Sequence, residues 1–126
     1  MLGRYRIVRG KRPPGQPLPK GRRIDIRKHT SHVLRPDAEL VVEFLKRPDA
    51  AAWSRYTALY LAELERRFAA DRAPFDALAD EARAGDVYLG CNCPTKKNPD
   101  VQRCHTYLAL GFMKKKYPKL EVVLPL

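Results

Sequence analysis

The sequence predicts a single α/β domain over residues 1–126, in which a small, partly parallel sheet is flanked by helices and the chain ends in a βαβ unit. Three observations predict this class. A length of 126 residues suits one domain with one core. Helical periodicity fills the middle of the chain, between short apolar runs near its two ends. Residues 87–126 have the order strand, loop, helix, strand, which is typical of parallel sheets.

The first strand is expected at residues 5–8 (YRIV), where apolar residues are β-branched or aromatic. A basic loop follows at residues 10–21, because the four prolines and three glycines of GKRPPGQPLPKG prevent regular structure. RRIDIR, at residues 22–27, alternates polar and apolar side chains and favours a half-buried second strand.

Three helices are expected next. Pro36 fits the first position of a helix over DAELVVEFLKR, which ends before Pro48. A third helix runs from Pro74 to a stop at Gly85. Between them, a longer helix carries an apolar stripe at spacings of three and four, which is typical of a packed core and not of a surface that stacks nucleobases. The stripe consists of Trp53, Tyr56, Tyr60, Leu64 and Phe68.

The end of the chain changes character. DVYLGC, at residues 86–91, predicts a buried strand, and the polar segment NCPTKKNPDVQR predicts a loop. A helix that carries Cys104, Leu108 and Phe112 on one face follows and ends at Pro118. LEVVLP, at residues 120–125, predicts the closing strand.

The charge is concentrated at the two ends of the chain, within a net charge of +11. Residues 1–29 carry ten Lys and Arg against one acid, and residues 87–126 carry seven against two. The middle carries eight against eleven acids. This distribution predicts a polyanionic partner, either nucleic acid or a nucleotide phosphate, and the alternative is a solvated arm that confers solubility.

The expected compartment is the cytoplasm, with no membrane partner. No apolar run approaches the roughly 20 residues that span a bilayer. The basic N-terminal segment lacks the apolar stretch of a secretory signal. Three cysteines, an odd number, favour free thiols, a metal or catalysis over a disulfide scaffold.

The segment 90–105, GCNCPTKKNPDVQRCH, holds all three cysteines and one of the three histidines. Cys91 lies at the carboxyl end of a predicted strand, where α/β folds bind their ligands. Cys104 and His105 lie near the start of the next helix. If Asn98 caps that helix, Cys104 lies in its second turn; if the helix begins near Arg103, its N-terminus strongly stabilises the Cys104 thiolate.

The pattern of strand, GCNC, polar loop, RCH and helix resembles the C-terminal signature of domain-of-unknown-function family 488 (DUF 488). The resemblance extends upstream to YRIVRGKRPPG and to LRPDAELVVEFLKRPDAAAWSRYTALYLAEL. It implies an α/β fold and a shared Cys-His position, and it implies no assigned activity. This chain departs from the commoner pattern in a second loop cysteine, Cys93, and a longer loop with TKKNPD.

Two interpretations make the cluster a functional site. In the first, Cys104 or Cys91 is a reactive thiol and His105, or a histidine of residues 29–32, is the acid or base. The candidate residues for catalysis or anion binding around them are Asp25, Arg27, Lys96, Lys97 and Arg103. In the second, Cys91, Cys93, Cys104 and His105 are candidate ligands of zinc or iron, although adjacent helical residues such as Cys104 and His105 point about 100° apart.

Two further interpretations remain open. Cys91 or Cys93 could form a redox pair with Cys104, or the cysteines could pack as small apolar side chains. The working hypothesis is a Cys/His site at a strand–helix junction that handles a phosphate-bearing ligand, a nucleotide or nucleic acid. The rival is a non-catalytic nucleic-acid-binding or interaction module with structural or metal-holding cysteines.

Overall fold

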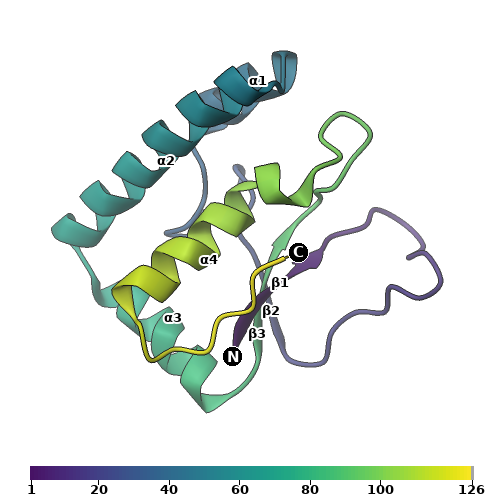
Figure 1. The fold of residues 1–126 in the computed structure, drawn as a ribbon. Helices are drawn as coiled ribbons and strands as arrows, with labels where there is room; N and C mark the ends of the chain where they lie inside the picture. Colours follow the sequence, from purple (N-terminus) through teal and green to yellow (C-terminus); the bar gives the residue numbers. More distant parts are fainter. Residues whose placement is uncertain (126) are drawn as a thin grey trace.

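The computed structural model describes residues 1–125 and confirms a single-sheet α/β architecture (Figure 1). The elements follow in the order β1 (Leu2–Arg6), β2 (Arg22–Asp25), α1 (Ala38–Lys46), α2 (Ala50–Ala70), α3 (Ala73–Ala84), β3 (Val87–Cys91), a short 3-10 helix η1 (Val101–Arg103) and α4 (His105–Lys116). In the described part of the chain, no helix is both long and apolar enough to cross a membrane.

The sheet has the order β1-β3-β2, and both outer strands run parallel to β3. The C-terminal segment lies beside β1, where Leu2 N–H donates to Glu121 O at 2.9 Å and Val123 N–H donates to Leu2 O at 2.9 Å. The closing strand of the predicted βαβ unit is therefore a single parallel bridge between Leu2 and Val122. All three strands end at the same edge of the sheet, called the carboxyl edge below.

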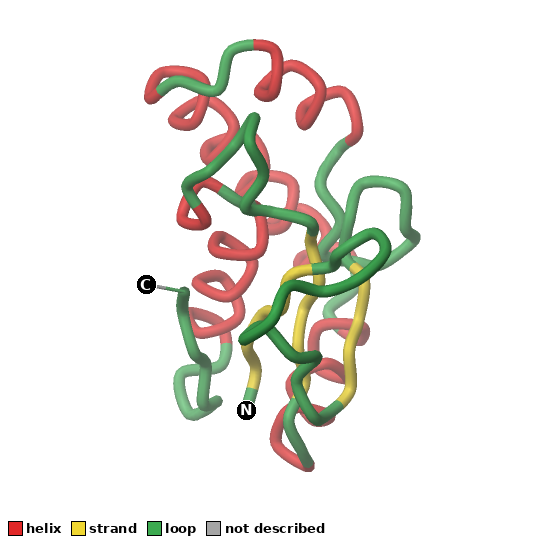
Figure 2. Tube along the Cα trace, turned by 90° about the vertical axis from the view of Figure 1, so that its right-hand side faces the viewer, coloured by secondary structure: helices red, strands yellow, loops and turns green. Residues whose placement is uncertain are grey.

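The two faces of the sheet differ in chemistry. Side chains alternate along a strand, so Val87, Leu89 and Cys91 share one face, and all three are buried. The helices cover that face: α4 packs on β1 and β3, α2 packs on α4, and α1 packs on α2. In Figure 2 the strands run side by side and the long helices lie to one side of them. The opposite face carries Tyr88 and Gly90.

The aromatic stripe of α2 lies in the core, as its spacing predicts. Tyr56, Tyr60 and Leu64 are buried, and Tyr60 donates its hydroxyl hydrogen bond to Leu34 O at 2.6 Å. Because the polar atom of this buried ring has a partner, the ring contributes its full apolar area without a desolvation penalty.

The starts of the first strand and of the first helix differ from the predicted ones. The first strand begins at Leu2, not Tyr5, because the fully buried Leu2 pairs with Val87 and extends the ladder toward the N-terminus. The first helix begins at Ala38, because the Asp37 carboxylate accepts hydrogen bonds from the N–H groups of the following turn. Pro36 therefore precedes the cap and is not the first helical residue.

Candidate metal centre at the carboxyl edge of the sheet

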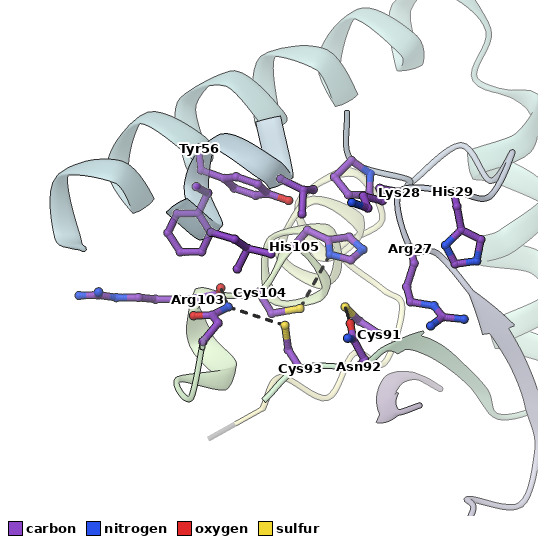
Figure 3. A pocket seen from close by; sticks show the side chains of 15 residues that line it. Arg27, Lys28, His29, Tyr56, Cys91, Asn92, Cys93, Arg103, Cys104 and His105 are labelled. Carbon is purple, nitrogen blue, oxygen red and sulfur yellow. Dashed lines mark hydrogen bonds between the residues drawn. The ribbon is translucent and has the colours of Figure 1, made fainter. Parts of the chain in front are cut away.

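The structure brings the three cysteines together. Cys91 ends β3, Cys93 lies two residues later in the loop, and Cys104 is the N-cap of α4. Their Sγ atoms all lie within 4.8 Å of one another. Cys91 and Cys104 are 5% and 3% exposed, and Cys93 is half-buried. Figure 3 shows the three sulfur atoms facing a common space.

The loop between β3 and α4 explains this convergence. The N–H of Thr95 donates to Asn98 O at 3.0 Å, and the Asn98 side chain donates to Arg103 O at 2.8 Å, so the loop folds back on itself. Asp100 caps η1 through the N–H of Gln102. The chain thus returns to the edge of the sheet, and α4 starts at His105 and not at Pro99. This start is close to the second of the two expected alternatives.

Polar groups that sequence reasoning missed support the sulfur atoms. The Thr106 hydroxyl donates to Cys104 Sγ at 3.2 Å, and the Asn98 amide donates to Cys93 Sγ at 3.7 Å. Arg4 donates to Thr106 Oγ1 at 3.0 Å and to Cys93 O at 2.7 Å. Donors of this kind stabilise thiolates and orient metal ligands. The sequence signal that could have indicated them is the threonine directly after Cys104 and His105, in the first turn of the helix.

The three thiols differ in pKa. Hydrogen bonds from Cys91 and Cys93, helped by His105, lower the pKa of Cys104 well below its usual value despite burial. Hydrogen bonding to Cys104 and burial raise the pKa of Cys91. Hydrogen bonding to Cys104 also raises the pKa of Cys93. Of the three thiols, Cys104 is therefore the one whose thiolate the site favours most, and the N-terminus of α4 acts in the same direction.

His105 lies behind the sulfur atoms. Its Nε2 is 2.9 Å from Ile26 O and its Nδ1 is 3.8 Å from Cys104 Sγ, while the ring meets Tyr60 edge-on. Since a carbonyl only accepts, Nε2 must carry a hydrogen and donate it to Ile26 O. In residues 1–125, the set of mutually close ligand atoms contains the three sulfurs and not His105.

A pocket of about 280 Å³ opens onto the cysteines. Cationic side chains lie on two flanks of the pocket, with Arg27 and Lys28, next to His29, on one flank and Arg103 on the other (Figure 3). An apolar wall comes largely from α1 and the residue before its cap: it contains Pro36, Val41, Phe44, Leu45 and Tyr56. The pocket therefore suits a ligand that combines an anionic group with a flat or apolar one.

Of the residues predicted on the second strand, only Arg27 lines the pocket. Asp25 pairs in register with Gly90, so its side chain leaves the sheet on the face opposite to Cys91. There it binds Arg27 at 2.8 Å. Partial burial pushes the pKa of Asp25 upward, but the hydrogen bonds from Arg27 outweigh it and hold this pKa below its usual value.

The predicted ligand-binding cations lie at different depths. Arg103 lines the pocket and its guanidinium is 3.5 Å from Pro48 O. Lys96 and Lys97 are exposed on the loop after β3 and do not line the pocket. The site therefore has an inner group of cations at its walls and an outer group on the surrounding loops.

Comparison with known families agrees with this architecture. The chain belongs to the DUF488-N3a family, described as the active DUF488-N3 subclade, whose profile matches residues 4–117. The resemblance predicted from the GCNC and RCH segments is thus confirmed. No curated protein and no solved structure matches the chain.

Proposed function

We propose that Cys91, Cys93 and Cys104 hold a zinc ion and that this centre handles a phosphate-bearing ligand, a nucleotide or nucleic acid, in the adjoining pocket. One observation carries the proposal: three sulfur atoms from separate parts of a strand–loop–helix unit lie within 4.8 Å of one another at the pocket wall. A core that needed only small apolar side chains would not surround them with the donors of Thr106 and Asn98.

The distances suit a thiolate-bound metal. With Zn–S bonds of about 2.3 Å, thiolates of a tetrahedral site lie about 3.8 Å apart, so sulfurs within 4.8 Å need shifts of only about 1 Å. Three thiolates on Zn²⁺ leave one net negative charge. Arg4, the Thr106 hydroxyl and the N-terminus of α4 all lie where they stabilise that charge.

Three protein ligands leave a fourth position, which is the pattern of zinc sites that act on a ligand. Side chains that line the pocket would surround that position. Arg27, Lys28 and Arg103 can neutralise phosphate oxygens, while the bound metal would polarise a ligand oxygen or activate water. Among residues 1–125, no carboxylate lines the pocket, so an acid or base step would fall to His29, to His105, to a thiol or to the metal-bound water.

A second candidate needs no metal. Cys104 caps α4 and accepts a hydrogen bond from Thr106, a position that suits a nucleophilic thiolate. The rival from another class is a non-catalytic binding module in which the metal only ties β3 to α4. These alternatives differ in metal content and in thiol reactivity.

Metal analysis of the purified protein tests the proposal. We expect about one equivalent of zinc per chain, with iron as the other thiolate-binding metal to assay. Each of C91S, C93S and C104S is expected to retain less than about a tenth of an equivalent. The matched control is H29N, because His29 lines the same pocket but lies outside the sulfur set.

The outcomes separate the candidates. Wild-type protein that holds neither zinc nor iron, even after incubation with either metal, would contradict the metal centre. If such protein also reacts with iodoacetamide selectively at Cys104, the nucleophile candidate replaces it. Metal retained in full by any single cysteine variant would contradict the three-ligand set.

A further inference from the structure

We infer that the phosphate-bearing ligand is a nucleic-acid single strand, held by a cationic rim around the pocket; this inference rests on the proposed function of the site. The cationic rim is defined as the exposed cations on the loops that leave the carboxyl edge of the sheet. It consists of Arg9, Lys11, Lys28, Lys96 and Lys97; Lys20, which is also exposed on the loop after β1, lies next to the start of β2 and is not included.

The topology gathers the rim at one edge. Because β1, β2 and β3 are parallel, the segments after them begin side by side. Arg6 is in register with Cys91, and Ile7 N–H donates to Cys91 O at 2.9 Å, so the loop after β1 starts at the cysteines. Arg12 then donates to Arg6 O at 2.6 Å and to Gln16 O at 2.7 Å, which folds this loop back against the strand end.

The rim cations have no carboxylate partners within residues 1–125. The nearby acids are already engaged, since Asp25 binds Arg27 and Asp100 caps η1. Some cations elsewhere are paired, such as Arg55 with Glu43 and Arg83 with Asp80, whereas others within residues 1–125, such as Lys115 and Lys119, have no carboxylate partner. The rim therefore places uncompensated positive charge beside the pocket, where it can attract a polyanion.

The extent of the rim favours a nucleic-acid single strand over a free nucleotide as the ligand. β1 and β2 lie on either side of β3, so the loops that follow them begin about 10 Å apart and diverge from there. Several phosphates in succession can contact cations at this spacing, whereas the single phosphate of a nucleoside monophosphate contacts only one flank at a time. The pocket has an apolar wall that includes Val41 and Leu45, which suits a base unstacked from a single strand.

Salt-dependent binding of a fluorescent single-stranded DNA of about 12 nucleotides tests the inference. The rim variant is K96A/K97A. The matched control is K115A/K119A, which removes the same charge from exposed lysines near the other end of α4. We expect the rim variant to bind about tenfold more weakly and to lower the slope of log K against log salt by about 1.4, because each phosphate contact on a single strand contributes about 0.7.

The control variant is expected to match wild type in affinity and slope. Equal losses in the two variants, or no binding at low salt, would overturn the inference. AMP that displaces the oligonucleotide at equal phosphate concentration, with no effect of K96A/K97A on AMP binding, would instead identify a free nucleotide as the ligand and also overturn it.

Metal content measured on the same samples separates this result from the fate of the metal centre. A full equivalent of metal without oligonucleotide binding contradicts only the single-stranded nucleic acid as the ligand. If the protein holds no metal and only the rim variant loses oligonucleotide binding, the result supports a single-stranded nucleic acid as the ligand. It then contradicts only the metal centre.

Discussion

The two ends of α4 differ in the kind of side chains that they contact. At its C-terminal end, Phe112 packs against Phe68 and Phe75, and Lys116 pairs with Glu65 at the surface. At its N-terminal end, buried polar groups point at sulfur atoms: Thr106 is fully buried and donates to Cys104. The first end gains stability from apolar contact, whereas the second gathers groups that stability alone does not need.

The energetic balance of the two ends therefore differs. Aromatic rings at 5 to 6 Å, as between Phe68 and Phe75 at 5.2 Å, stabilise the fold through area and ring contacts. Polar atoms buried around the cysteines lose hydration that a thiol recovers only weakly. We therefore expect metal binding to offset the desolvation cost at the cysteine end. The aromatic contacts should supply the stability of the metal-free chain.

The largest effect on stability is expected from the aromatic end. Phe75 is fully buried, and Phe75→Ala should lower the free energy of unfolding by about 3–5 kcal/mol, because it leaves a cavity among the rings. Urea denaturation measures the loss, and F75L provides a milder step if F75A does not fold. The folded fraction should keep its zinc. A variant that loses metal in proportion to stability would show that the two ends are not independent.

The second effect is on the metal and not on the fold. Thr106→Val keeps the shape but removes the donor to Cys104 Sγ, and we expect zinc affinity to fall about 10–100-fold in a competition assay with a chromogenic chelator. The matched control is T57V in α2, since Thr57 Oγ1 is buried and has no hydrogen-bond partner within residues 1–125. Equal zinc affinity in T106V and wild type would remove Thr106 from the site.

The two faces of β3 offer a third and smaller test. A Cβ at Gly90 would lie 2.7 Å from Tyr5 Cε1 and 2.8 Å from Ile7 Cδ1, so Gly90→Ala should destabilise the protein by about 1–3 kcal/mol as these side chains shift. Gly90 points away from the face of Cys91, so the zinc stoichiometry should stay. Gly3→Ala is the control, because its Cβ would meet Met1 Sδ at an ordinary 3.4 Å. Similar losses in both variants would contradict this account.

Local patterns predicted most of the fold and the position of the site. Periodicity of three and four placed the aromatic residues of α2 in the core, because a helix buries one stripe whatever its partner is. A strand followed by a loop and a helix places Cys91 and the start of α4 at one edge of a parallel sheet. The proximity of Cys91 and Cys104 follows from these local rules.

The remaining details depend on contacts between distant segments. The pairing of Asp25 with Gly90 follows from the register of β2 against β3, which no local pattern specifies, whereas the face on which Asp25 lies has a local signal. Ile24 and Ile26 carry the signal in retrospect: their apolar side chains face the helices, so Asp25 must face away. Arg4 supports Thr106 across 102 positions of sequence, and only the folded chain brings that pair together.

The smallest effect is expected at His32, a half-buried residue of the loop after β2. Burial lowers the pKa of His32 below its ordinary 6.5, and its Nδ1 accepts a hydrogen bond from Leu34 N–H at 3.0 Å. The unfolded chain thus binds more protons than the folded one, so the free energy of unfolding should decrease as the pH falls through about 6.5. Metal-free protein is required, since acid also releases metal from thiolates. His32→Asn keeps an acceptor without titrating and should flatten this part of the pH profile; an unchanged profile would assign the pH dependence to another group.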